Sequence, residues 1–326
     1  MGAIEDLLIG HDARGAKAWA LAAAVAIAGT QIAAASGLSD PSSALYLSSR
    51  LHVLGTLLGG ILFGLGMTLV GTCSFGLIVR SGGGDLRALV TAGVVGICAY
   101  VATSGLLAPL RIAIWDAGVV QLPVSRPASL PAIATWSGGP VAAGLLILAV
   151  AGGLGLLALA DPRLRKRPRL LGSACAMGAA VALGWIVTGQ AVEAMTMERA
   201  ESLSFVAPMG RALLQVMIEP FRNVGFGVSA LAGVCVGSFA VTALRRELRL
   251  EAFDDPREMR RHLVGAGLMG VGGVLAQGCT IGQGLSATSV LAPSALLFLP
   301  ALLLGARIGL WHLIEGQTFW RPSKSG

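Results

Sequence analysis

The sequence predicts an all-α polytopic membrane protein. Of its 326 residues, 55% are hydrophobic and only 13% are charged, a balance too apolar for the surface of a soluble domain. Several apolar runs reach about 20 residues, the length that crosses the hydrocarbon core of a bilayer. These runs lack the alternation of polar and apolar residues that a membrane β-barrel shows, so each run is expected to be a helix.

Eight spans are expected, each an apolar run long enough to cross the hydrocarbon. In chain order they cover about residues 18–36, 52–79, 86–108, 138–160, 171–189, 222–244, 262–283 and 288–310.

Two arginine-rich loops predict how these spans are oriented. Residues 161–170 hold five Arg and Lys residues, and residues 244–262 hold six arginines. Lys and Arg gather in cytoplasmic loops, so both loops are expected inside, and alternation then places 190–221 and the Pro-rich segment 109–137 outside. The net charge of +7 is therefore attributed to membrane topology, and no nucleic-acid partner is expected.

The chain resembles itself when it is shifted by 206 residues. This shift brings glycines 59, 64, 66 and 76 onto glycines 265, 270, 272 and 282, Cys73 onto Cys279, and Ser74 onto Thr280. We expect a first repeat over 1–110, a second over 171–326, and a connection over 111–170 whose span 138–160 inverts the second repeat. Inverted repeats with interrupted helices at matching positions indicate a substrate site near the membrane midplane.

The candidate site consists of the two stretches that interrupt spans, "GTCSFG" from Gly71 and "QGCTIGQG" from Gln277. A helix that begins inside the membrane presents unpaired N–H groups, which favour an anion. A thiol adds a weak donor and a soft sulfur atom without a fixed charge. We therefore expect Cys73 and Cys279 to face each other near the midplane as a substrate relay. The binding residues expected around them are Gly71, Thr72, Ser74, Gly76, Gly278, Thr280, Gly282 and Gln283, with Arg80 near the mouth of the pathway.

The remaining cysteines, Cys98, Cys175 and Cys235, lie in ordinary apolar helix and are interpreted as packing residues. No cysteines occur as CxxC, so neither a disulfide framework nor a zinc site is expected. The sequence contains no GxxxxGK[ST] loop, so ATP hydrolysis is not expected. No cofactor and no metal are predicted, and the protein is expected to be a transporter rather than an enzyme.

The stretches "RAESLSFVAP" (199–208), "RRHLVGAGLMGVGGVLAQGCTIGQGLSATSVLA" (260–292) and "LLGGILFGLGMTLVGTCSFGLIVRSGGGDLRALV" (57–90) closely resemble the YeeE/YedE family of bacterial inner-membrane proteins. This resemblance implies an hourglass-shaped helical fold of two related halves, in the inner membrane, with short helices meeting at the centre. It also implies import of thiosulfate along cysteine thiols, of which Cys73 and Cys279 match the family positions. A soluble cytoplasmic sulfurtransferase is the partner expected by analogy.

Two departures from the family pattern leave alternatives open. The opening "MGAIEDLLIG" resembles a segment that follows the first family helix, so a start inside the first repeat, without a third relay cysteine, is expected. The first-half motif reads "CSFG" where the family often has Cys-Gly-Asn-Lys, which leaves the cargo open to another sulfur or selenium compound. A membrane sulfurtransferase that forms a cysteine persulfide is the second class of function, although neither cysteine has a His or Lys beside it.

Overall fold

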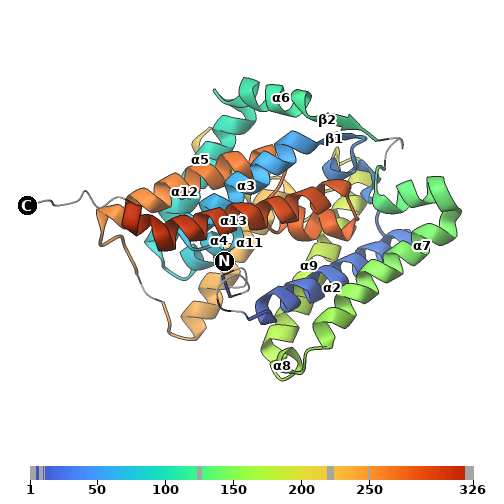
Figure 1. Ribbon diagram of the computed structural model, residues 1–326, viewed down its shortest axis with the longest axis horizontal. Coiled ribbons are helices and arrows are strands. Elements are labelled where there is room, and N and C mark those ends of the chain that lie inside the picture. Colours follow the sequence, from blue (N-terminus) through green and yellow to red (C-terminus); the bar gives the residue numbers. More distant parts are fainter. Residues whose placement is uncertain are drawn as a thin grey trace, which may run out of the picture.

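The computed structural model describes residues 5–6, 10, 12–122, 127–218, 224–248 and 250–319. It is built almost wholly of helices (Figure 1). Among the described residues, seven helices are long and apolar enough to cross a membrane: Arg14–Ala35, Val53–Gly82, Leu86–Ser104, Gly139–Leu159, Pro168–Glu193, Phe226–Leu244 and Pro293–Ile314. The predicted multi-pass helical protein is therefore confirmed. The segment before Arg14, where the start is expected to fall inside the first repeat, lies mostly outside the described residues.

The first part of the chain forms α2 (Arg14–Ala35), the short helices η1 (Pro41–Ser43) and η2 (Leu45–Leu47), β1 (Arg50–His52), α3 (Val53–Val70), α4 (Ser74–Gly82), α5 (Leu86–Ser104), α6 (Ala108–Ala117) and β2 (Val119–Gln121). The second part forms α7 (Leu130–Leu159), α8 (Pro162–Arg165), α9 (Pro168–Glu193), α10 (Val206–Met217), α11 (Phe226–Leu244), α12 (Pro256–Leu275), the π-helical η3 (Gly282–Ala287) and α13 (Pro293–Phe319).

Both predicted interruptions are confirmed. Helix α3 stops at Val70 because Gly71 adopts a left-handed conformation with φ of 79°, which glycine tolerates at no steric cost, and α4 begins at Ser74. In the second half, α12 stops at Leu275 and Gln277 takes a φ of 61°. The following residues form a turn and then the π-helical η3, a rare conformation that is frequent at functional sites.

Helices α3 and α12 pack against each other as an antiparallel pair at the centre of the molecule (Figure 1). A methyl group added at Gly59 would come within 2.6 Å of the Gly272 carbonyl oxygen, and one at Gly272 would come within 2.7 Å of the Gly59 carbonyl oxygen. Gly66 and Gly265 approach each other in the same reciprocal way, at 2.5 and 2.8 Å. The backbones therefore touch at two levels of this pair, as small residues allow in membrane helices.

The neighbouring helices repeat this relation. Gly64 of α3 lies against the backbone of α13 at Leu302, and Gly270 of α12 lies against the backbone of α5 at Val95. The 206-residue shift converts the first of these contacts into the second, within one helical turn. The inverted relation of the two halves stays a prediction, and these matched contacts support it.

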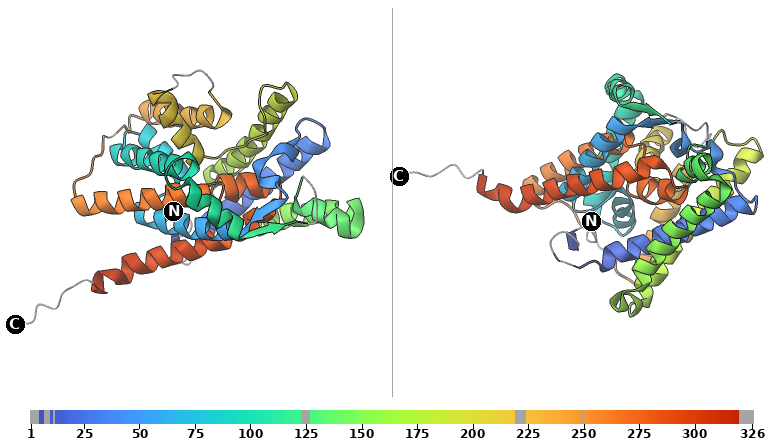
Figure 2. Two further views of the ribbon diagram at one scale, coloured as in Figure 1. Left: turned by 90° about the horizontal axis from the view of Figure 1, so that it is seen from above. Right: turned by 45° about the vertical axis from the view of Figure 1, so that its right-hand side comes forward.

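Helices α2, α7 and α9 form a group at one end of the molecule (Figure 1). Gly178 of α9 packs closely on the backbone of α2 at Ala22, and Lys17 of α2 pairs with Asp161 just after α7 at 2.7 Å. This hydrogen bond lowers the pKa of the Asp161 carboxyl group. Both views of Figure 2 place α7 at the periphery, and only 11% of its apolar span is buried, as expected for a helix that faces lipid.

The structure differs from the sequence-based expectations in three places. The segment 109–137, expected as a loop, contributes most of α6 and also β2, which pairs antiparallel with β1 so that Leu51 lies opposite Val120. The loop 190–221 contains α10, which packs on α5. The predicted span 262–283 is helical only to Leu275, and α12 is less apolar than the other long helices because its first turns are charged.

Candidate functional site

The Cys279 stretch, residues 277–289, is buried almost throughout. The Cys279 side chain is fully buried, and its sulfur accepts a hydrogen bond from the backbone N–H of Gly282 at 3.4 Å. The Cys279 carbonyl oxygen accepts from the N–H of Gln283 at 2.8 Å. The chain therefore wraps tightly around the cysteine, and the thiol proton remains available to a partner because the sulfur uses only its acceptor side here.

Tyr46 and Ser204 come from two distant parts of the sequence and close around Gly282. A methyl group added at Gly282 would lie 2.8 Å from the Ser204 hydroxyl oxygen and 3.0 Å from the Tyr46 hydroxyl oxygen. Only glycine leaves this much space for the two hydroxyls. Burial raises the pKa of the Tyr46 phenol, and the nearby Cys279 raises it further, so Tyr46 stays protonated and can donate a hydrogen bond.

Gln283 has a structural role that differs from the predicted contact with substrate. Its side-chain amide donates to the Ala276 carbonyl oxygen at 2.7 Å, and its amide oxygen accepts from the Ser294 hydroxyl at 3.2 Å. These two bonds bridge the break between α12 and α13. Gln283 therefore fixes the backbone around the cysteine.

The Cys73 stretch, residues 71–76, is more open. Cys73 is half-buried and occupies the N-cap position of α4, where no side chain caps the first turn. The first N–H groups of α4 lie directly beside the cysteine and carry the positive end of the helix dipole. A methyl group added at Gly71 would meet no atom within 4 Å, whereas one added at Gly76 would clash with the Thr72 hydroxyl.

A buried hydroxyl follows each cysteine, and neither hydroxyl has a hydrogen-bond partner within the described part of the chain. These are Ser74, which is fully buried, and Thr280, which is 7% exposed. The two residues match under the 206-residue shift. Buried hydroxyls are nearly always paired in proteins, and leaving one unpaired costs about 1–3 kcal/mol. The hydroxyls of Thr30 and Ser39 are also buried without a partner in the described part of the chain, but only Ser74 and Thr280 lie at equivalent positions beside the two thiols, which makes them candidate donors to a ligand.

The packing of α3 on α12 gives no support to a face-to-face pair of thiols. Val70, the last residue of α3, touches α12 at Gly265, midway along that helix, and Gly55 in the first turn of α3 touches Leu275, the last residue of α12. The cysteine stretches thus begin at opposite ends of the contact between these antiparallel helices. No hydrogen bond joins Cys73 to Cys279, both of which are described.

Residues at the start of α10 connect the two stretches. Ser204 lies against Gly282, and the next residue, Phe205, places its ring 5.1 Å from the ring of Phe75 on α4. One short segment of chain, residues 204–205, therefore contacts both cysteine stretches.

Arg80 is already engaged in an ion pair. Its guanidinium contacts the Asp85 carboxylate at 3.0 Å, and its side chain is 46% exposed. Asp85 also accepts from Arg87, and the Leu86 N–H donates to the Glu251 carbonyl oxygen at 2.9 Å. The arginine-rich loop of the second half thus docks beside the end of α4. Arg80 lies on the side where the sequence predicts the cytoplasm, but it is not an isolated cation.

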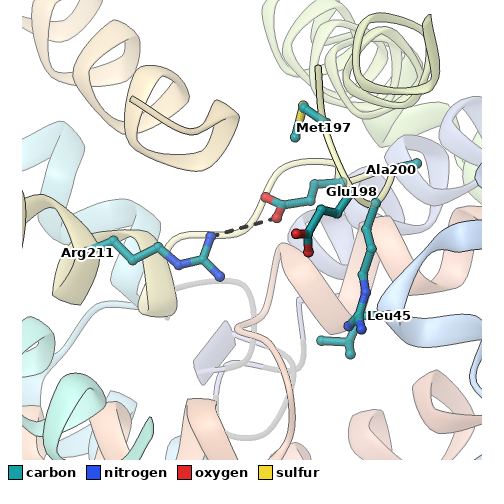
Figure 3. Close-up of a pocket in the computed structure, with 7 residues that line it drawn as sticks. Leu45, Met197, Glu198, Ala200 and Arg211 are labelled. Atoms are coloured by element: carbon teal, nitrogen blue, oxygen red, sulfur yellow. Dashed lines mark ion pairs between the residues drawn. The ribbon is translucent and has the colours of Figure 1, made fainter. Parts of the chain in front are cut away.

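Two adjoining cavities lie on the opposite side, next to the Cys279 stretch. The outer cavity has a volume of about 490 Å³ and is lined mainly by residues 197–201, with Leu45 and Arg211 (Figure 3). The inner cavity, of about 100 Å³, adds Tyr46, Ser204 and Gln277 to this lining. Leu45 and residues 197–201 fall in loops that the predicted topology places outside. The cavities therefore lead from that face to the hydroxyls that surround Gly282.

The sequence analysis missed Tyr46, Ser204 and Arg211. Ser204 lies within the stretch "RAESLSFVAP" that carries the family resemblance, so this motif was the available signal. Of the three other cysteines, Cys98 packs on Gly270, and the Cys235 backbone packs on Gly82, in line with their interpretation as packing residues. Cys175 is exposed on α9.

Comparisons with known proteins identify the family of the chain. The model of the family described as "Sulphur transport" matches residues 1–308. The chain is also 26% identical, over 269 residues, to a protein of Escherichia coli (strain K12) named "Thiosulfate transporter TsuA", and the match covers 79% of this chain and 74% of that protein. The chain is a multi-pass membrane protein, its resemblance to YeeE/YedE proteins is confirmed, and it belongs to the sulphur transport family.

Proposed function

We propose that this protein imports thiosulfate, which passes from the outer cavities to Cys279 and then to Cys73. The pair of unpaired hydroxyls at Ser74 and Thr280 carries this proposal. Each hydroxyl can donate to an oxyanion oxygen, and the thiol beside it can donate to the terminal sulfur. The backbone N–H groups at the N-terminus of α4 add positive potential at Cys73, and they do so without a charged side chain that could move.

Two separate binding positions suit conduction better than one tight site. Binding must be firm enough to admit the ion and weak enough to release it, and weak sites in series meet both conditions. Neutral donors hold a doubly charged anion less firmly than an arginine clamp would. The relative named as a thiosulfate transporter supports thiosulfate as the first cargo to test.

The experiment measures uptake of ³⁵S-thiosulfate by proteoliposomes that contain the purified protein. Ser74→Ala and Thr280→Val should each reduce uptake at least about tenfold, because each removes one donor to a doubly charged ion. The same variants should keep or raise the Tm, since each deletes a buried hydroxyl that lacks a partner.

The matched control is Ser286→Ala. The Ser286 hydroxyl is also buried in the Cys279 stretch, but it donates to the Leu203 carbonyl oxygen at 2.7 Å. This variant should lower the Tm by more than the two test variants while uptake per folded molecule changes little. Full uptake by Thr280→Val together with Cys279→Ala would refute the proposed route.

Selenosulfate and sulfite are offered as competitors to define the cargo. Stronger inhibition by either anion than by unlabelled thiosulfate would assign another sulfur or selenium compound. Mass spectrometry of the protein after incubation with thiosulfate tests the alternative class, because a persulfide on Cys279 would indicate sulfur transfer rather than passage. A cytoplasmic sulfurtransferase as the acceptor of the cargo stays a prediction.

A further inference from the structure

We propose that Glu201 is the resident counter-ion of Arg211 between the two cavities, and that an entering divalent oxyanion displaces it. This inference rests on the proposed function, because it concerns the entrance of the same route. It assigns a specificity role to a pair that the sequence patterns did not single out.

The position of the pair is the first observation. The Arg211 guanidinium lies 3.7 Å from the Glu201 carboxylate, and both residues line both cavities. Figure 3 shows Arg211 reaching from α10 across the opening toward the opposite wall, where the dashed line marks this ion pair. An anion that moves from the outer cavity toward Tyr46 and Ser204 must therefore pass the pair.

The backbone around Glu201 is fixed, so only the side chain can move. The Glu201 N–H donates to the Thr188 hydroxyl at 3.1 Å, and that hydroxyl donates to the Glu201 carbonyl oxygen at 2.6 Å. On either side, the Ala200 N–H donates to Ser43 and the Ser202 hydroxyl donates to Val181. These bonds tie the segment to α9 and to the loop after α2. The carboxylate extends from a rigid support.

The ion pair itself is weak. Its distance is long for a charge-assisted hydrogen bond, and the side chains are 58% and 37% exposed, so water screens the attraction. A doubly charged oxyanion offers two oxygens to the fork of the guanidinium and more charge than one carboxylate. Exchange of Glu201 for the oxyanion is therefore favourable, whereas a monovalent ion such as chloride gains too little to displace the carboxylate.

The charges around the outer cavity explain why this exchange favours divalent over monovalent anions. Glu198 and Glu201 balance Arg199 and Arg211, so the resting cavity holds two charges of each sign. An anion meets a net attraction only when it replaces a carboxylate on an arginine. Selection between divalent and monovalent anions is thus achieved at the pair, before the thiols are reached.

The test measures thiosulfate binding to the purified full-length protein in nanodiscs by isothermal titration calorimetry, with chloride as competitor. Glu201→Gln keeps the shape of the side chain and removes its charge, so the Kd for thiosulfate should fall about fivefold and chloride should begin to compete. Arg211→Gln should raise the Kd at least about tenfold, and Arg211→Lys should restore part of the loss.

Glu198→Gln and Arg199→Gln are the matched controls, because both residues line the outer cavity and neither lines the inner one. They should change the Kd for thiosulfate less than Glu201→Gln and Arg211→Gln do. Glu198→Gln should also not let chloride compete. Equal behaviour of Glu201→Gln and Glu198→Gln would overturn the inference.

Uptake separates this inference from the proposed function. If the wild-type protein binds thiosulfate through Arg211 but proteoliposomes take up none, the proposed transport fails and the counter-ion role stands. If uptake is intact and the Glu201 and Glu198 variants are indistinguishable in binding, only the counter-ion role fails.

Discussion

The two cysteine stretches match in sequence but differ in how the protein surrounds them. Around Cys279 the chain makes a turn that leads into the π-helical η3, and the residues from 278 to 287 are all buried. Around Cys73 the chain makes a simple glycine turn, and the thiol is half-buried. The same local motif therefore occurs once in an enclosed form and once in an open form.

The difference follows from what packs on each stretch. Trp19 of α2 covers Gly284 so closely that an added methyl group would clash with its ring, and Tyr46 and Ser204 cover Gly282. The Cys73 stretch is followed by α4, which packs on α5 and α11. An enclosed position can strip water from an anion and select it, while an open position can release it. The two stretches are thus suited to opposite ends of one route.

The largest expected effect is in thiol reactivity. In a background of Cys98→Ala, Cys175→Ala and Cys235→Ala, the half-buried Cys73 should react with a small methanethiosulfonate reagent at least about tenfold faster than the fully buried Cys279. Rates are measured by mass spectrometry in nanodiscs, with one of the two cysteines present at a time. Equal rates would remove the distinction between the enclosed and the open stretch.

The glycines should respond differently to a methyl group. Gly282→Ala places it against the Tyr46 and Ser204 hydroxyls, so we expect a loss of about 1–3 kcal/mol of stability together with loss of uptake. Gly71→Ala meets open space and should cost only about 1 kcal/mol, because its φ is positive. Chemical denaturation and uptake are compared for the two variants. Gly144→Ala on α7, which also meets open space, is the control with ordinary helical backbone.

An effect on stability alone is expected from exchanging one residue between the stretches. The shift by 206 residues brings Leu77 onto Gln283, so Gln283→Leu gives the enclosed stretch the residue of the open one. The variant loses the bonds to Ala276 and Ser294, which should cost about 1–3 kcal/mol. Ser294→Ala breaks only one of these bonds and should cost about 1 kcal/mol. A Tm for Gln283→Leu above that of Ser294→Ala would contradict the bridging role.

The helices were predictable because the length of an apolar run and the positions of its glycines, both local features of the sequence, determine where a helix runs and where it stops. Each of the eight expected spans overlaps at least one helix, and the spans 52–79 and 262–283 are broken next to Cys73 and Cys279. The ribbon of β1 and β2 was missed because each strand has three residues, too few for a pattern of alternation. The charged start of α12 was missed because Glu258 pairs with Arg87 of α5 and His262 packs on Phe253 of the loop before the helix, which no local pattern records.

The site was predictable only where its residues lie within one motif. The two repeated stretches contain the thiols, the hydroxyls of Ser74 and Thr280, and the glycines beside them. Tyr46 and Arg211 lie far from the two stretches in the sequence, and the packing of η2 and α10 brings them to the inner cavity. Because α3 and α12 run antiparallel, the two cysteine stretches begin at opposite ends of the contact between these helices, and spacing along the chain carries no information about this arrangement.

The glycine contacts between α3 and α12 limit how this protein can move. Main chains that touch at two levels leave no compressible side-chain layer between them, so rocking one half over the other would break both contacts at once. Under the proposed function, we therefore expect the cargo to advance through small rotations of hydroxyl, thiol and carboxylate groups inside a static frame. The protein would then keep nearly constant outer dimensions during transport. The rate of transport should therefore depend little on bilayer thickness.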